Sequence, residues 1–270
     1  MAGTAAMNKA KIAKRVIEVL EFFDEEHREA TVMDIVRRYK RPQSSTSELL
    51  TSLVDLGLLY KDPLSRSYTL TPRAAMLGSH FQPAIVRDGR LATLIDRLHA
   101  QTGLGLALFG MVGLNCQIFT WRSGARRIAS SRPEGITGGM QERLTDSAVG
   151  WLLLSSVAQP RRDGMVRRLN AEGSEDRKFA FADMSARLQS CAERGYAVGP
   201  LGYDSTADMC AVLLPDQPDN RPMALAFTYD AADRVDTSAL VQCLQYGVQR
   251  CAETSGINNA MVQPFPSAAA

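Results

Sequence analysis

Apolar side chains recur at helical spacing along the first sixty residues, in three separate stretches. The first stretch covers residues 12–23 and the second covers residues 32–39, with a polar break between them. Residues 31–34 have the form of a capping box at the start of the second helix. A second box, at residues 45–48, is expected to open a third helix that ends before Gly57, since a left-handed C-terminal cap suits glycine.

The third helix is polar in its first turn and apolar afterwards. Its first turn, residues 44–48, is small and polar, and its leucines begin only at Leu49. A recognition helix needs this layout, because its N-terminal turn enters the DNA major groove while the remainder packs on the other helices. Two strand-like runs, residues 58–60 and 68–70, then flank a turn with a basic tip. This order predicts a winged helix-turn-helix over residues 9–78; the alternative is a helical bundle with a hairpin that binds a protein.

The remainder of the chain alternates between strand-like and helix-like segments. After a linker at residues 79–90, we expect a domain over residues 91–253 and a loose, aperiodic tail over residues 254–270. Strands are predicted at residues 104–112, 116–121, 126–131, 209–214 and 223–229, and helices at residues 91–103, 148–157, 161–171, 179–194 and 237–252. These segments predict an α+β domain, with an antiparallel sheet flanked by helices.

The composition fits a two-domain protein of the cytoplasm. The chain has 270 residues and a formal net charge of +2, so any DNA-binding surface has to be local. Its five cysteines form no CxxC pair, which is typical of free thiols in a reducing compartment. No segment has the pattern of a signal peptide, and no run of about 18 apolar residues could span a membrane. We therefore expect a cytoplasmic location.

Catalytic and metal-binding chemistry has little support in the sequence. The three histidines, His27, His80 and His99, fall in separate segments. A nucleophilic pair of Cys210 and His99 has no local motif behind it, so a buried structural thiol is the better account of Cys210. The sequence contains neither a GxxxxGK[ST] phosphate loop nor a GxGxxG motif after a strand, and it lacks metal-ligand spacing. We predict no enzymatic activity, no cofactor and no metal.

Residues 14–78 resemble the N-terminal domain of IclR-type bacterial transcriptional regulators. The resemblance rests on Arg15-Val-Ile-Glu-Val-Leu20, Pro42-Gln-Ser-Ser45, Leu49-Leu50, Leu53-Val-Asp-Leu-Gly57, and Tyr68-Thr-Leu-Thr-Pro-Arg73 with Leu77-Gly78. The order of elements behind this region is similar to the GAF-like effector-binding domain of the same family, with anchors at residues 144–150, 195–196 and 209–215. The resemblance implies a DNA-binding regulator with a domain that senses a small metabolite.

The resemblance also implies a homodimer or tetramer that reads a pseudo-palindromic operator in double-stranded DNA. The candidate base contacts are Gln43, Ser44, Ser45, Thr46, Ser47 and Glu48, and the candidate phosphate contacts are Lys14, Arg15, Arg41, Lys61 and Arg66. The basic cluster at residues 37–41 could be a solvated face, but its place just before the recognition helix favours phosphate contact. Family members often carry Lys and His-Arg where this chain has Gln43, Ser47 and Glu48. Because Gln pairs with adenine and Glu accepts from cytosine, we expect a different operator.

In the family, the effector lies against the sheet, under the loop and helix start that correspond to residues 144–150. The candidate effector contacts are therefore Leu144, Asp146, Ser147, Ala148, Gly150, Cys210, Phe227 and Tyr229. A helix N-terminus attracts anions, although Asp146 could itself cap this helix. Phe227 and Tyr229 replace family serines. The resemblance thus implies an aromatic or other organic acid as effector, or a pocket partly filled by the chain's own side chains.

Two other functions stay open. A ligand-independent repressor would use the C-terminal domain only for oligomerisation, and the replacements at Phe227 and Tyr229 favour it. An enzyme with an autoregulatory DNA-binding domain would need a catalytic constellation, which the sequence lacks.

Overall fold

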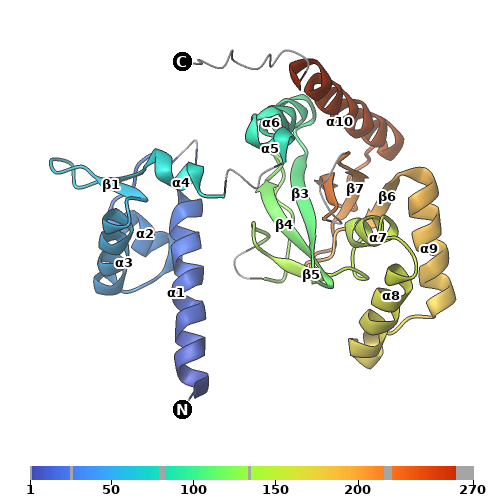
Figure 1. The fold of residues 1–270 in the computed structure, drawn as a ribbon, viewed down its shortest axis with the longest axis horizontal. Coiled ribbons are helices and arrows are strands. Elements are labelled where there is room, and N and C mark those ends of the chain that lie inside the picture. Colours follow the sequence, from blue (N-terminus) through green and yellow to red (C-terminus); the bar gives the residue numbers. More distant parts are fainter. Residues whose placement is uncertain (1, 25–26, 79–82, 133–134, 216–220, 260–270) are drawn as a thin grey trace, which may run out of the picture. The chain divides into compact units, whose positions relative to one another are not determined.

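A computed structural model describes residues 2–24, 27–78, 83–132, 135–215 and 221–259 (Figure 1). The chain divides into two compact units, Met1–Gln82 and Pro83–Ala270. Each unit has an apolar core of its own. The two-domain α+β fold expected from the sequence is thus confirmed.

The first unit is a winged helix-turn-helix. Its elements are α1 (Ala2–Phe22), α2 (Val32–Tyr39), α3 (Gln43–Asp55), β1 (Leu59–Lys61), β2 (Tyr68–Leu70) and α4 (Pro72–Met76). Val19 of α1, Ile35 of α2 and Leu50 of α3 meet in its core. β1 and β2 pair as an antiparallel hairpin, and Tyr68 joins the same core. The three apolar stripes of the sequence therefore converge on one centre.

Local hydrogen bonds set the start of α2 and the end of α3. The Asp34 carboxylate accepts from the Thr31 N–H at 2.8 Å, and the Asp34 N–H donates to the Thr31 hydroxyl at 3.4 Å. This is the capping box predicted from the sequence, and it is confirmed. At the end of α3, Gly57 has a φ of 70° and donates its N–H to the Val54 carbonyl, as a left-handed cap requires.

The second predicted capping box is wrong. α3 begins at Gln43, directly after Pro42, and no side chain caps this end. The hydroxyls of Ser45 and Thr46 instead donate to the Pro42 carbonyl, at 3.3 and 2.9 Å. Pro42 has a φ of −60° and a ψ of 138°. Because the proline ring favours this φ, the residue is suited to stand just before the first helical turn, and the helix starts earlier than predicted.

The second unit is a six-stranded sheet with helices on both faces. Its helices are α5 (Ala84–Arg87), α6 (Arg90–Thr102), α7 (Ala148–Ser155), α8 (Arg161–Glu172), α9 (Phe181–Arg194) and α10 (Thr237–Asn259). Its strands are β3 (Gly105–Val112), β4 (Asn115–Arg122), β5 (Gln141–Arg143), β6 (Tyr196–Pro200), β7 (Asp208–Leu213) and β8 (Met223–Tyr229). The strand order is β5-β4-β3-β8-β7-β6, and every described pair is antiparallel. β5 and β6 therefore form the two edges.

The two faces of the sheet carry different side chains, because successive residues of a strand point to opposite faces. One face carries alanines such as Ala211 and Ala226, and it packs under α7, α8 and α9. The other face carries Val212, Leu225 and Phe227, and it packs under α5, α6 and α10 (Figure 1). We call these the α7 face and the α10 face.

The strands differ from the sequence prediction at three places. Residues 126–131 form no strand, and only Ser130 makes an isolated bridge, to Ser205. β5 and β6, the two edge strands, were not predicted. β5 is a polar run of three residues, and β6 ends in glycine and proline, so neither shows the apolar alternation that identifies a strand.

Two domain borders also differ from the prediction. Residues 84–90, assigned to the linker, form α5 and the start of α6 within the second unit, and Ile85 is buried in its core. α10 continues to Asn259, past the predicted start of the tail at residue 254. Residues 79–82 of the linker and 260–270 of the tail lie outside the described residues.

Candidate functional site

The exposed face of α3 carries part of the predicted base-reading set. Gln43, Ser44 and Glu48 are exposed, and Ser45 and Ser47 are partly buried. Thr46 is only 1 % exposed, because helical spacing turns it inward with Leu50 and Leu53. The predicted base contact at Thr46 is therefore wrong, since its side chain packs inside the unit.

The same exposed face continues beyond the residues that were predicted. Thr51, Ser52 and Asp55 are exposed on the later turns of α3. Helical spacing from Ser44 and Glu48 could have identified them. α3 thus presents hydroxyls, an amide and two carboxylates, and its sequence contains no basic residue. Contacts to DNA phosphates have to come from other elements.

Two of the predicted phosphate contacts turn inward instead. The Arg15 guanidinium donates to the Ser45 carbonyl at 2.9 Å and to the Ser45 hydroxyl at 3.2 Å. Arg41 forms an ion pair with Glu18, whose side chain is 15 % exposed. Lys14 also lies 3.6 Å from Glu18. The contacts of Arg15 and Arg41 tie α1 to the first turn of α3 and to the turn before it, so these two arginines brace the unit.

The wing and the end of α2 hold exposed basic side chains. Lys61 lies over the Tyr68 ring, 5.4 Å from its centre, and Arg66 is exposed at the hairpin tip. Arg38 and Lys40 are exposed where α2 ends, and neither forms an ion pair within the described part of the chain. These four side chains are the best placed to reach phosphates. Of the four, the sequence analysis named Lys61 and Arg66 as contacts, and it favoured phosphate contact by the cluster that contains Arg38 and Lys40.

The sheet separates the predicted effector contacts into two groups. Leu144 and Ala148 belong to the core on the α7 face, whereas Cys210, Phe227 and Tyr229 belong to the core on the α10 face. The prediction of one site from both groups is therefore wrong. A shift of one residue along a strand moves each side chain to the other face, and the assignment on β7 and β8 was displaced in this way.

Thr228 is a polar side chain that the sequence analysis missed on β8. Because β8 alternates and Ala224 and Ala226 lie in the core of the α7 face, Thr228 points to that face as well. It is 1 % exposed, and its hydroxyl has no hydrogen-bond partner among the described residues. A buried hydroxyl without a partner costs about 1–3 kcal/mol. Thr228 is thus a candidate ligand contact.

The N-terminus of α7 is capped by a residue of the chain itself. The Ser147 hydroxyl accepts from the Gly150 N–H at 3.2 Å, so Ser147 is the cap. The suggestion that Asp146 caps α7 is wrong, because Asp146 pairs with Arg177 at 2.9 Å. A Cβ on Gly150 would lie 2.3 Å from the Leu144 carbonyl oxygen. Gly150 is therefore required by close packing, which explains this position without a ligand.

Tyr203, in the loop between β6 and β7, is inserted into the core of the α7 face. It is 0 % exposed, its hydroxyl donates to the Cys116 carbonyl at 2.9 Å, and its ring centre lies 6.2 Å from that of Phe109. Gly202, Tyr203 and Asp204 have φ values of 80°, 55° and 54°. The left-handed conformation costs a residue other than glycine about 1–2 kcal/mol. The contacts of the loop hold it in this conformation.

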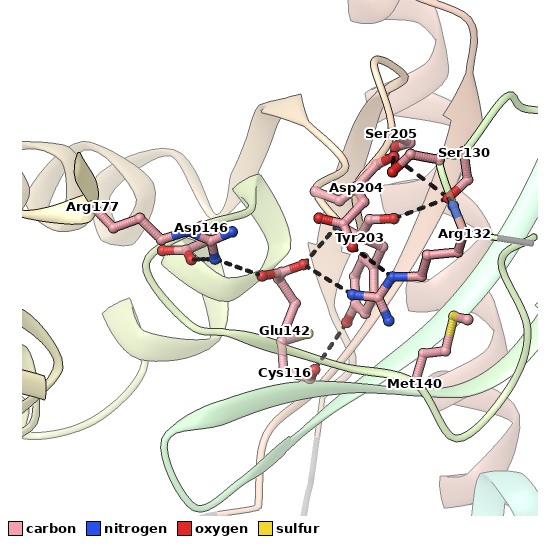
Figure 2. A network of polar contacts seen from close by, with 12 residues as sticks. Cys116, Ser130, Arg132, Met140, Glu142, Asp146, Arg177, Tyr203, Asp204 and Ser205 are labelled. Atoms are coloured by element: carbon pink, nitrogen blue, oxygen red, sulfur yellow. Dashed lines mark hydrogen bonds and ion pairs between the residues drawn. The ribbon is translucent and has the colours of Figure 1, made fainter. Parts of the chain in front are cut away.

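Ion pairs and hydrogen bonds hold the outer side of the Tyr203 loop (Figure 2). Glu142 of β5 accepts from the Tyr203 N–H at 2.9 Å. Arg132 donates to the Asp204 carboxylate at 2.7 Å, and Arg177 lies 3.5 Å from Glu142. We call Arg132, Glu142, Arg177 and Asp204 the polar latch. None of its four residues was predicted, because contacts between segments far apart in the sequence create it.

Burial keeps two cysteines of the second unit in the thiol form. Burial raises the pKa of Cys116 to about 12, and burial likewise raises the pKa of Cys210 to about 12. Both thiols therefore stay protonated near neutral pH, and the thiolate is the nucleophilic form. His99 interacts through Nδ1 with the Leu104 carbonyl at 2.9 Å. Burial also raises the pKa of the Glu142 carboxyl.

A surface pocket of about 410 Å³ opens beside the polar latch. Its lining includes Thr145, Phe179 and Met184 together with Glu142, Arg177 and Tyr203. Tyr203 belongs to its lining although its side chain is 0 % exposed. Among the described residues, no three His, Cys, Asp or Glu side chains are grouped to hold a metal ion. No described helix is long and apolar enough to cross a membrane.

Comparison with known proteins identifies the N-terminal unit. Residues 13–63 match the model of the IclR helix-turn-helix domain. No curated protein matches the sequence. The IclR of Thermotoga maritima is 16% identical with a TM-score of 0.58, and the match covers 92% of this chain and 99% of that chain.

Two further solved structures match the second unit or the whole chain. The effector domain of a putative IclR transcriptional regulator from Acinetobacter sp. ADP1 is 24% identical, with a TM-score of 0.53, over 62% of this chain and 95% of that one. An IclR homolog of Microbacterium hydrocarbonoxydans, solved with 4-hydroxybenzoate, is 17% identical, with a TM-score of 0.55, over 90% of this chain and 99% of that one.

The family model describes a helix-turn-helix domain, and the likeness of the second unit to a solved effector domain shows its fold. The N-terminal unit is an IclR helix-turn-helix domain, and the chain has the fold of IclR-type transcriptional regulators. The resemblance seen in the sequence is confirmed.

Proposed function

We propose that the protein controls transcription by binding a pseudo-palindromic operator as a homodimer or tetramer. The observation that carries this proposal is the exposed polar face of an IclR-type α3 beside basic side chains on the wing and on α2. Gln43, Ser44 and Glu48 would read bases from the major groove, because they lie exposed in the first turn of α3. Lys61 and Arg66 would contact phosphates, which fixes position without reading sequence.

The operator can be found by sequencing genomic fragments that the purified protein retains. The proposal expects a motif with two inverted half-sites about one or more helical turns apart. Arg66→Ala should weaken binding to every sequence and reduce the salt slope by about one ion, whereas Glu48→Gln should change the preferred bases more than the affinity. Arg41→Ala is the matched control for Arg66→Ala, because Arg41 is already paired with Glu18. Retention of random fragments without a shared motif contradicts the proposal.

The effector site we propose lies on the α7 face, where Tyr203 now occupies the core. A phenol or an aromatic acid would enter through the pocket beside the polar latch and replace the Tyr203 ring. Two features support this ligand class: the buried Tyr203 ring and the Cys116 carbonyl that accepts from its hydroxyl. A ligand of this kind would change the DNA affinity only if it binds the two arrangements of the dimer unequally.

Thermal shifts with a panel of benzoates and hydroxybenzoates test this site. The proposal expects stabilisation of the wild type by some aromatic acid, and tighter binding of the same acid by Tyr203→Ala, which removes the resident ring. Thr228→Val is the control, because Thr228 lies opposite Gly105 at the other end of β3 from Cys116, and it should bind the acid as the wild type does. An acid that binds Tyr203→Ala no better than the wild type contradicts the displacement of Tyr203.

A ligand-independent repressor is the second candidate, and the closed core around Tyr203 favours it. In that case Tyr203 would be a permanent part of the core, and the second unit would serve only oligomerisation. No thermal shift with any acid, together with unchanged DNA affinity, would establish this alternative over the first.

A further inference from the structure

The outer edge of β6 lies in a groove of about 630 Å³ that the DNA-binding and effector proposals leave unused. One wall is α9 and the other is the first part of α10. α9 packs on the α7 face and α10 packs on the α10 face. The groove therefore straddles the edge of the sheet, and its floor is a strand with no neighbouring strand on that side among the described residues.

The backbone of β6 presents unused hydrogen-bonding groups to this groove. β6 pairs with β7 in a register that includes Gly199 opposite Met209. Leu201 continues this register and donates its N–H to the Ala207 carbonyl at 2.9 Å. In an antiparallel ladder, residues that face the partner alternate with residues that do not. Gly199 and Ala197 therefore bond to β7, and the N–H and C=O groups of Tyr196 and Val198 point outward.

The charge of the groove is positive. Its lining includes two arginines, Arg187 and Arg194, and no carboxylate. Arg187 lies over the Trp151 ring, 4.1 Å from its centre, which fixes the guanidinium at the groove. The nearby Asp236 accepts from the Ser238 and Ala239 N–H groups, so it serves as the cap of α10.

We propose that this groove binds an extended acidic segment of a partner protein, which adds to β6 as a further strand. The free backbone groups of Tyr196 and Val198 would supply main-chain hydrogen bonds, and Arg187 and Arg194 would pair with carboxylates on the added strand. Pro200 has no N–H and ends the usable edge. A second copy of this chain is a poor occupant, because two-fold pairing of β6 would bring the arginines of both copies together.

Fluorescence anisotropy with labelled peptides tests the groove. The probe is an eight-residue peptide of alternating Thr and Glu. The proposal expects it to bind the full chain, and expects at least a tenfold loss in the double variant Arg187→Gln, Arg194→Gln. Val198→Pro removes one outward N–H and should weaken binding by a similar factor. Arg161→Gln with Arg168→Gln on α8, outside the groove, is the matched control and should bind normally.

Two further peptides distinguish the occupants. A Thr-Lys peptide should not bind, and a Thr-Glu peptide N-methylated at alternate residues should lose at least tenfold, because it cannot complete the strand ladder. Equal binding of the N-methylated peptide would show a site for carboxylates alone and would overturn the proposal. So would self-association of the chain that Val198→Pro abolishes, since the edge would then hold a second copy. The arginine variants keep the test valid if Val198→Pro does not fold.

Discussion

The two faces of the six-stranded sheet differ in what they enclose. The α10 face packs large apolar side chains such as Leu225 and Phe227 against helices. The α7 face carries several alanines, and it encloses the Tyr203 ring and the unpartnered hydroxyl of Thr228. A continuous apolar face contributes stability, whereas small side chains leave space that polar or aromatic groups can occupy. The difference assigns structural support to the α10 face and the candidate binding chemistry to the α7 face.

Phe227→Ala should have the largest effect on stability. Phe227 is fully buried on the α10 face, and truncation of a buried phenylalanine costs about 3–5 kcal/mol. Urea unfolding of the full chain, followed by a probe in the second unit, measures the loss. The folded fraction should bind any aromatic acid as the wild type does. Weaker binding by the folded fraction would contradict the separation of the two faces. Val198→Ala, at an exposed position on β6, is the control and should change stability by less than about 0.5 kcal/mol.

Gly150→Ala should rank second, although alanine is the better helix former. The added Cβ would stand 2.3 Å from the Leu144 carbonyl oxygen, and overpacking of this kind costs about 1–3 kcal/mol. Gly164→Ala in α8 is the matched control, because its Cβ would meet no atom within 4 Å. The control should raise stability by up to about 1 kcal/mol. Similar changes in stability for both variants would contradict the claim that close packing against Leu144 requires a glycine at position 150.

Local patterns explain how much of the first unit could be predicted. The Thr31–Asp34 box and the glycine cap at Gly57 depend on neighbours a few residues apart, so the sequence shows them directly. The start of α3 was misplaced because Ser45 and Thr46 look like a cap, whereas their hydroxyls bond to the carbonyl of Pro42. Thr46 was taken for a base contact because polarity alone does not tell which way a helical side chain faces.

The site in the second unit could not be predicted because its contacts are distant in sequence. Tyr203 meets Cys116, which is 87 positions away, and Arg132 meets Asp204, which is 72 positions away. Strand alternation could have placed Thr228 on the α7 face, but only once β8 had been assigned to the correct face. The resemblance to a family supplied the helix start near Leu144, and a shift of one residue on β8 selected Phe227 and Tyr229 instead of Thr228.

Tyr203→Phe should lower stability by about 1 kcal/mol, less than either variant above. It keeps the buried ring and removes the hydroxyl that donates to the Cys116 carbonyl at 2.9 Å, the usual net contribution of one hydrogen bond. Tyr246→Phe is the control, because Tyr246 is 62 % exposed. Equal and negligible losses in thermal or urea unfolding would mean that the Tyr203 hydroxyl contributes nothing to the α7 face. A loss as large as that of Phe227→Ala would show that the hydroxyl contributes more than this one hydrogen bond.

Glu142→Gln should have the smallest effect at neutral pH, and it reveals the electrostatics of the polar latch. Burial raises the pKa of Glu142, although the Tyr203 N–H and Arg177 oppose this shift. The folded chain then holds the proton more tightly than the unfolded chain, whose glutamate titrates near pH ~4.3. The wild type should therefore gain stability relative to Glu142→Gln as the pH falls from 7 through the raised pKa. Glu172→Gln, an exposed carboxylate on α8, controls for general charge effects. Free energies of unfolding of both proteins at pH 7, 6 and 5 measure the trend. If the stability of the wild type relative to Glu142→Gln falls as the pH is lowered, the ion pairs of Glu142 affect its pKa more than its burial does.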